Sequence, residues 1–146
     1  MKEKYFYLII PLIVAVIIQL IKIIIQISKG KFSWKNLIDY GGMPSGHTAL
    51  VVSITTLIFF NYGLANVFFA VSFILTILII RDALGFRRYL ADHSKAINEL
   101  IKDLPDELEY KYKIQEERIG HTAGEVLGGA VISIILTYLL YYYFFN

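Results

Sequence analysis

Residues 47–80 read HTALVVSITTLIFFNYGLANVFFAVSFILTILII and contain no Asp, Glu, Lys or Arg. A helix that crosses a bilayer needs roughly 20 mostly apolar residues. The sequence Asn-Tyr-Gly at positions 61–63 favours a turn, so the stretch divides into two apolar segments. We predict one membrane span over about 47–62 and another over about 64–80. The first is short, and a re-entrant pair joined at residues 62–64 is the alternative.

Two further apolar runs lie on either side of this stretch. The first covers residues 5–26, and the last covers residues 119–145 with a single acid, Glu125. The N-terminal run is too long for a cleavable signal and lacks a small-residue cleavage site. The chain is 57% hydrophobic and has a mean hydropathy of +0.60, which excludes an ordinary soluble domain. We therefore predict one all-α domain, residues 1–146, built as a polytopic membrane helix bundle of about four transmembrane helices.

The absence of cysteine excludes disulfides and thiolate metal sites. The net charge of +2 is weak and gives no indication of nucleic-acid binding.

Two polar segments, 27–46 and 81–118, hold most of the charge. In the second, apolar residues recur at helical spacing: Leu90, Ile97, Leu100, Ile101 and Leu104. This pattern predicts an amphipathic helix that lies on the membrane or caps the bundle and ends at Pro105. We expect a second surface helix over 106–118.

The basic residues indicate an orientation. With four spans, eleven Lys and Arg residues belong to the two polar segments, and only Lys2 and Lys4 belong to the opposite side. Cytoplasmic loops carry an excess of Lys and Arg. The sequence therefore predicts an integral protein of the cell membrane with its polar segments in the cytoplasm.

Aromatic residues agree with this topology. The aromatic residues at 5–7 would meet those at 141–145 at one membrane interface, and Phe32, Trp34 and Tyr40 would mark the other. Because an even number of crossings separates His47 from His121, the polar residues at the ends of the spans should all lie at one membrane face.

The first candidate motif is Met43-Pro44-Ser45-Gly46-His47, which opens a predicted helix. Free backbone N–H groups and the helix dipole at such an end favour a phosphate. Ser45 can add a hydroxyl, and Gly46 allows close approach of the backbone. The structural alternative is a plain turn with a capping serine and a histidine satisfied at the interface.

The second motif is His121-Thr122-Ala123-Gly124-Glu125. Residues 121 and 125 stand four apart, so we expect them to share one helix face. A carboxylate beside a histidine stabilises its charged form and leaves the far nitrogen available for attack or metal binding. An acid inside an apolar span is a functional candidate, although an ordinary pair on the helix surface is the alternative.

The third motif, residues 81–88, is rich in arginine. Arg81, Arg87 and Arg88 are candidates for binding phosphate oxygens through the planar guanidinium, while membrane anchoring is the alternative. Asp82 is a candidate for orienting an arginine or for ligating a metal. Lys22, near the end of the first span, either contacts the same phosphate or extends to the interface.

These three motifs together resemble the type 2 phosphatidic acid phosphatase superfamily, and in particular its divergent branch. The resemblance lies in Gly-Gly-Met-Pro-Ser-Gly-His, Arg-Asp-Ala-x-Gly-x-Arg-Arg and Gly-His-Thr-x-x-Glu-Val, over residues 41–129. It implies a helical core shared with the vanadium haloperoxidases, although a haloperoxidase is not expected from a short membrane bundle. It also implies chemistry that needs no metal and no cofactor.

The resemblance also implies roles for individual residues. His121 matches the nucleophile that forms a phosphohistidine, Glu125 replaces the aspartate that orients it, and His47 matches the general acid. Ser45 and Gly46 match phosphate-binding positions. The family's Ser-Arg pair before the nucleophile is replaced by Ile114 and Gln115, and its early Lys-Arg-Pro motif is absent. Our hypothesis is that Arg87, Arg88 and Lys22 supply that charge.

Three hypotheses follow. The leading one is a membrane phosphatase that hydrolyses a lipid phosphate or pyrophosphate through a phosphohistidine. The second is a non-catalytic protein that binds or transports lipid phosphates. The third is a metal-dependent site formed by Asp82, Glu125 and the histidines. The expected partners are the substrate and the membrane lipids, and the sequence leaves the lipid and any homo-oligomer open.

Overall fold

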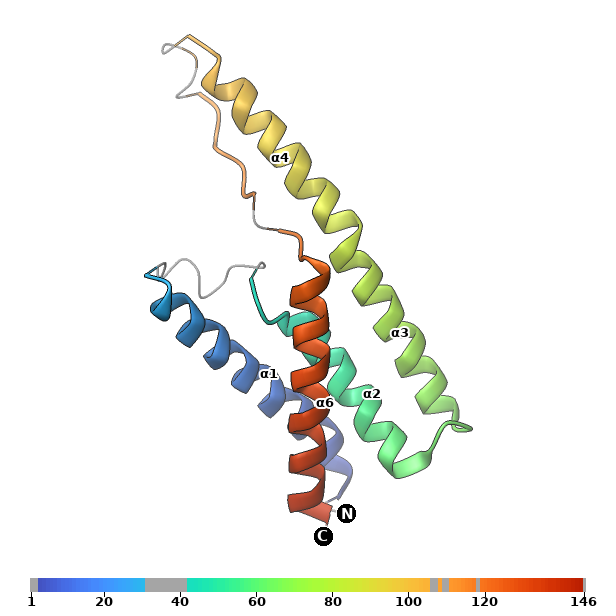
Figure 1. Cartoon of the computed structure of the whole chain (residues 1–146). Coiled ribbons are helices and arrows are strands. Elements are labelled where there is room, and N and C mark those ends of the chain that lie inside the picture. The colour runs from blue at the N-terminus through green and yellow to red at the C-terminus, as the bar shows by residue number, and fades with distance from the viewer. Residues whose placement is uncertain (1–2, 31–41, 106–107, 109–110, 118, 146) are drawn as a thin grey trace.

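The computed structural model describes residues 3–30, 42–105, 108, 111–117 and 119–145, and the regular elements in these ranges are helices (Figure 1). The helices are α1 (Glu3–Ser28), α2 (Gly46–Tyr62), α3 (Val67–Leu84), α4 (Phe86–Lys102) and α6 (Ala123–Phe145). This confirms the all-α membrane bundle expected from the apolar runs.

Three helical stretches in the described ranges are long and apolar enough to cross a membrane: α1, α6, and α3 together with α4. Helix α2 has 17 residues and is shorter. It nevertheless ends beside the beginning of α1, where Tyr62 stacks on Tyr7 with ring centroids 5.8 Å apart. Helix α3 begins three residues later than predicted, because the Asn66 side chain accepts the Phe68 N–H at 2.8 Å and caps the helix at that point.

Helix α2 lies at the centre of the bundle and packs against α1, α3 and α6. Ile10, Val14 and Ile18 of α1 are buried, recur every four positions and therefore share one face. They meet two buried residues of α2, and the fully buried cluster consists of Ile10, Val14, Ile18, Ala49 and Leu57. Partly buried residues of α6 pack against this cluster: Ile132, Leu136 and Leu140.

Buried hydroxyl groups also connect the helices. The Ser53 and Thr137 hydroxyls lie 2.7 Å apart between α2 and α6, and those of Thr55 and Thr76 lie 2.9 Å apart between α2 and α3. The Ser133 hydroxyl donates to the Ala49 carbonyl at 2.6 Å. Such bonds are worth about 0.6 kcal/mol each in membrane proteins, so they fix the relative register of the helices more than they stabilise the bundle.

The helix ends divide the bundle into an aromatic end and a polar end. Phe6 packs on Phe144 and Phe145 with ring centroids 4.9 and 5.4 Å apart, which confirms contact between the two terminal aromatic clusters. The cluster predicted for the other interface, 32–40, lies outside the described residues. The start of α2, the end of α3 and the start of α6 lie together at the end opposite the termini, as the topology predicts (Figure 1).

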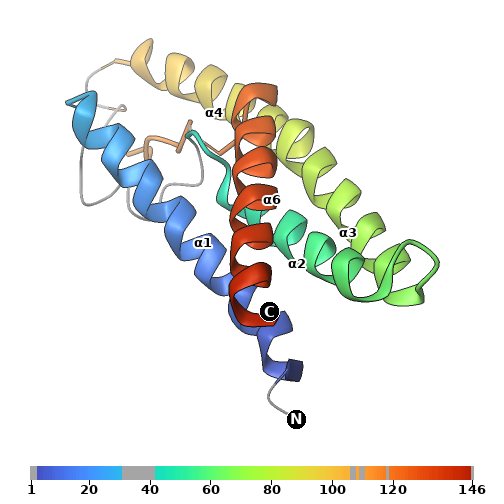
Figure 2. The same cartoon turned by 60° about the horizontal axis from the view of Figure 1, so that its bottom comes forward.

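Helix α4 follows α3 after a bend at Gly85 (Figure 2). The predicted helix is present, and its apolar residues are divided: Leu90, Ile97 and Leu100 are exposed, while Ile101 is buried together with Ser94 and Asn98. The helix ends at Lys102, before Pro105. The apolar side of α4 is therefore available to the membrane or to another apolar surface.

The second surface helix predicted over 106–118 is wrong for residues 111–117, which form a turn followed by non-helical chain, while Leu108 is helical. Residues 106–107, 109–110 and 118 lie outside the described residues. Asn98 of α4 explains this difference. Its Oδ1 accepts the Gln115 N–H at 2.8 Å, and its Nδ2 donates to the Gln115 carbonyl at 2.9 Å and to Glu117 Oε1 at 2.8 Å. Because Asn98 binds both backbone groups of Gln115, these groups do not join a helical ladder.

Candidate active site

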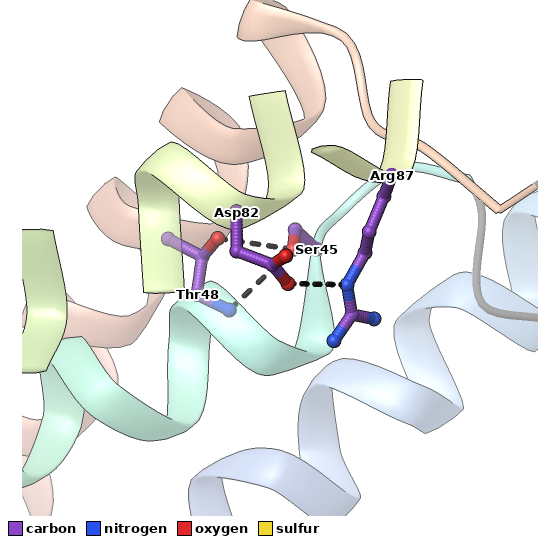
Figure 3. A network of polar contacts seen from close by, with 4 residues as sticks. All are labelled: Ser45, Thr48, Asp82 and Arg87. Carbon is purple, nitrogen blue, oxygen red and sulfur yellow. Dashed lines mark hydrogen bonds and ion pairs between the residues drawn. The ribbon is translucent and has the colours of Figure 1, made fainter. Parts of the chain in front are cut away.

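The turn before α2 presents the first two site residues. Ser45 is the N-cap of α2 and is fully buried. Its Oγ accepts the Thr48 N–H at 3.4 Å and the Thr48 hydroxyl at 3.0 Å (Figure 3). Gly46 is the first helical residue, and a Cβ placed there would meet no atom within 4 Å. The open approach to this helix start is suited to an anion, which the backbone N–H groups would bind.

Helix α6 holds this turn in place. The Ser45 N–H donates to the Glu125 carbonyl at 3.0 Å. A Cβ at Gly129 would lie 2.5 Å from the Ser45 carbonyl oxygen, a distance that only glycine avoids. The Gly124–Gly128 spacing suggests helix packing, but Gly124 is exposed and Gly128 faces the Met43 side chain. The close approach of backbones is therefore made by Gly129.

His121 lies in the segment that leads into α6. Its N–H donates to the Ala83 carbonyl at 3.2 Å, which attaches it to the end of α3. The residue is 4% exposed, and its buried Nδ1 has no hydrogen-bond partner among the described residues. The His47 ring lies nearly perpendicular to it, at 80°, with ring centroids 6.4 Å apart. The structure therefore brings together the two histidines that the motifs single out.

The Glu125 carboxylate makes its described hydrogen bond to Thr122, not to His121. Its Oε2 accepts the Thr122 N–H at 2.8 Å, and the Thr122 hydroxyl accepts the Glu125 N–H at 3.3 Å. This reciprocal pair is a capping box. The prediction assumed that the helix includes His121, but α6 begins at Ala123, so the helical spacing argument does not apply.

The electrostatics of His121 follow from its surroundings. Burial lowers its pKa from the ordinary value of 6.5, because the charged ring loses hydration. The charge of Glu125 opposes this effect, while those of His47, Lys22 and Arg87 add to it. The lowered pKa keeps His121 neutral near pH 7, the protonation state that a nucleophile requires.

Arg87 is the arginine of the third motif that reaches the site. Its Nε lies 2.6 Å from Asp82 Oδ2, and both side chains are partly exposed (Figure 3). This single contact orients the guanidinium through Nε and does not involve its two Nη groups, which can bind phosphate oxygens. Arg81 and Arg88 are exposed and are not among the charges that act on His121.

Lys22 is the second cation near the histidines. It belongs to α1 and is 5% exposed, so it does not extend into open solvent. Its Cε would lie 3.1 Å from a Cβ at Gly42, which places it against the segment before α2. Its charge also acts on His121. The structure thus brings Lys22 from α1 and Arg87 from α4 near enough for both charges to act on His121.

Sequence reasoning missed two residues of the site, Thr48 and Gly129. Thr48 stands three positions after Ser45, the spacing at which an N-cap oxygen meets the backbone N–H, and this spacing could have identified it. Gly129 lies in a run of small residues, and no sequence pattern distinguishes it from Gly128. Among the residues that the structure describes, no group of three or more His, Cys, Asp or Glu is placed to hold a metal ion.

Comparison with known proteins shows which family the chain resembles. A family model described as "Divergent PAP2 family" matches residues 4–136. The chain is 36% identical over 138 residues to the uncharacterized membrane protein YuiD of Bacillus subtilis (strain 168), an alignment that covers 86% of this chain and 87% of that protein. No solved structure matches.

Proposed function

The chain belongs to the divergent PAP2 family, and on that premise we propose that it is a membrane phosphatase which hydrolyses a lipid phosphate or pyrophosphate. The proposal rests on the pairing of His47 with His121. A nucleophile stands roughly 3 Å from the atom it attacks, and a general acid stands about 3 Å from the oxygen it protonates. Two rings with centroids 6.4 Å apart can therefore act on one phosphoryl group.

The proposed reaction has two steps. A neutral ring nitrogen of His121 attacks phosphorus, forming an N–P bond while the P–O bond to the leaving group breaks. His47 gives its proton to the departing oxygen. Water then attacks phosphorus and gives a proton to His47 as the N–P bond breaks, which releases inorganic phosphate and restores both histidines. Each acid–base group contributes typically about 10²–10⁴-fold to such a rate.

The cations stabilise the transition state in this mechanism. Arg87, oriented by Asp82, and Lys22 would bind the equatorial oxygens together with the Ser45 hydroxyl and the N–H groups at the start of α2. Electrostatic stabilisation of this kind is usually the largest single catalytic contribution. Glu125 acts on His121 through its charge and through the capping box that fixes the beginning of α6.

A phosphate-release assay in detergent tests this function. Purified protein is given a set of lipid mono- and diphosphates, and the His121→Ala and His47→Ala variants are compared with His93→Ala. His93 lies exposed on α4, outside the proposed site. The proposal expects release by the wild type and His93→Ala, loss in the other two variants, inhibition by vanadate and resistance to chelators. Undiminished release by His121→Ala would reject the nucleophile.

A second candidate function is lipid-phosphate binding or transport without turnover. The observation that favours it is the position of Glu125 Oε2, which binds the Thr122 N–H, while Nδ1 of His121 has no described partner. The replacement of the family's Ser-Arg pair by Ile114 and Gln115 points the same way. Saturable binding of a lipid phosphate with no release of phosphate over hours would support this function and exclude the phosphatase.

The proposal also includes the orientation of the protein in the membrane. The bias of Lys and Arg favours a polar end in the cytoplasm. The chain has no cysteine, so Lys95→Cys on α4 and Ala65→Cys in the turn between α2 and α3 provide single labelling sites, both exposed. An impermeant thiol reagent applied to intact cells should label only residue 65. Labelling of residue 95 alone would reverse the orientation.

A further inference from the structure

Gly120, the residue before His121, lies against the beginning of α4. A Cβ at Gly120 would lie 2.8 Å from the Arg88 Cα, 2.9 Å from the Arg88 nitrogen and 3.1 Å from the Arg87 carbonyl carbon. All three are backbone atoms in the first turn of α4, so no side-chain rotation makes room for a methyl group. Gly120 does not have a positive φ, so the requirement for glycine at this position is one of space.

The next residue is attached to the other side of the bend between α3 and α4. The His121 N–H donates to the Ala83 carbonyl at 3.2 Å, in the last turn of α3. The bend at Gly85 lies between this bond and the Gly120 contact, and the start of α6 lies beside it (Figure 1). Two consecutive residues therefore fix the segment before α6 to two consecutive helices.

The turn of α4 that Gly120 contacts also carries Arg87. The Nε of Arg87 bonds to Asp82 of α3 at 2.6 Å, across the same bend. A side chain at position 120 would have to push this turn away or break the bond from the His121 N–H, because overpacking is relieved by backbone shifts. Either response changes the separation between Arg87 and His121.

We propose that Gly120 is a positioning residue, which sets the separation between the Arg87 guanidinium and the His121 ring by packing on the backbone of α4. Its effect on catalysis rests on the proposed function, in which His121 attacks and Arg87 stabilises charge on the phosphoryl group. Small misplacements of such groups can cost about 10²-fold in rate. Its effect on the surroundings of His121 holds whether or not the protein turns over a substrate.

The ring of His121 reports on this separation through its titration. The charged or titratable groups that act on it are Glu125 of α6, His47 of α2, Lys22 of α1 and Arg87 of α4. Burial and the Arg87 charge both lower the pKa of His121. Of these four groups, Arg87 belongs to the turn that Gly120 contacts. Displacement of that turn weakens its effect and loosens the packing, and both changes raise the pKa of His121 towards 6.5.

The test is an NMR titration of protein labelled with ¹⁵N-histidine in detergent, beside the phosphate-release assay. The chain has three histidines, and the spectrum of His121→Ala identifies the signal of interest. Gly120→Ala should raise the pKa of His121 and lower kcat/KM more than tenfold. Gly124→Ala is the matched control, because its Cβ would meet only Thr122 Oγ1 at 3.9 Å. It should keep the wild-type titration and rate.

A double-mutant cycle separates positioning of Arg87 from a general effect on the fold. In an Arg87→Ala background, Gly120→Ala should cause a smaller rise in the pKa of His121 and a smaller loss of kcat/KM than in the wild type. The reason is that the cation which it displaces is already gone. Equal effects in both backgrounds would overturn the role of Gly120 in positioning Arg87.

The outcomes distinguish the role of Gly120 from the proposed function. An unchanged titration of His121 in folded Gly120→Ala would overturn that role. No phosphate release by the wild type would overturn the proposed function, and the titration would still decide the role of Gly120. If Gly120→Ala does not fold, the wild type should show a nuclear Overhauser effect between the Gly120 Hα protons and the Arg88 N–H, and Arg87→Ala should raise the pKa of His121. Absence of either would overturn the role of Gly120.

Discussion

Gly129 of α6 and Ser45 of the turn before α2 are in backbone contact, and a Cβ on Gly129 would lie 2.5 Å from the Ser45 carbonyl oxygen. The Ser45 N–H reaches the same helix through the Glu125 carbonyl at 3.0 Å. The turn that we propose binds a phosphate through its N–H groups thus packs on the helix that follows His121. Any change that separates the two elements moves the proposed anion site relative to the proposed nucleophile.

Gly129→Ala should disturb both stability and activity. Overpacking of this kind costs typically about 1–3 kcal/mol, and the displacement of the turn should reduce phosphate release more than tenfold, since small misplacements of catalytic groups can cost about 10²-fold. Thermal unfolding in detergent and the release assay measure the two effects. Gly124→Ala is the control, because its Cβ would meet only Thr122 Oγ1 at 3.9 Å. Equal behaviour of the two variants would contradict the packing argument.

The pH dependence follows from His121. Burial lowers its pKa below 6.5 in the folded chain, so the unfolded chain binds more protons as the pH falls through that range. Stability should therefore decline on acidification through pH 6.5 and below. The proposed attack needs the neutral ring, so kcat/KM should also fall on the acid side, with a midpoint below 6.5. A midpoint above this value, measured over pH 4.5–8, would be inconsistent with a buried nucleophile.

Glu125→Gln separates charge from capping. Glutamine preserves a side-chain oxygen for the Thr122 N–H, so stability should change little. The lost negative charge no longer raises the pKa of His121, and the acid limb of kcat/KM should shift to lower pH. Glu125→Ala should in addition lose the capping box, at a cost of roughly 0.3–1.5 kcal/mol. An acid limb that stays in place in Glu125→Gln would show that the carboxylate does not act on His121.

The two neighbouring arginines provide a further comparison. Arg87 is held by Asp82 and acts on His121, whereas Arg88 is exposed. Arg87→Ala should reduce kcat/KM about 10²–10³-fold, as expected when one donor to a developing charge is removed. Arg88→Ala should stay within about threefold, because it removes an exposed surface charge only. A greater loss from Arg88→Ala than from Arg87→Ala would show that Arg88, and not Arg87, contacts the phosphate.

Much of the fold could be predicted from the sequence, because a long uncharged segment has few structures available to it other than a membrane helix. The stretch 47–80 predicts two helices and a turn, and the positions of the basic residues predict which helix ends lie together. The paired histidines follow from this topology. The aromatic contact between Phe6 and the C-terminal end of α6 follows from the clustering of rings at both termini.

The local details depend on competing hydrogen bonds that the apolar pattern does not reveal. The capping box of Thr122 and Glu125 starts α6 after His121, and this removes the expected side-chain pair. Asn98 binds both backbone groups of Gln115, so residues 113–117 are not helical although the segment is charged. Arg87 differs from Arg88 by its ion pair with Asp82, which no periodicity predicts.

The most direct measurement of the central claim is the trapping of a phosphoenzyme. Purified protein is mixed with a lipid phosphate labelled with ³²P, quenched in alkali within milliseconds to seconds, and digested to locate the label. The account predicts an alkali-stable, acid-labile label on the peptide that contains His121, its absence from His121→Ala, and its retention in His93→Ala. Phosphate release by His121→Ala at the wild-type rate, or the same label on that variant, would contradict the account.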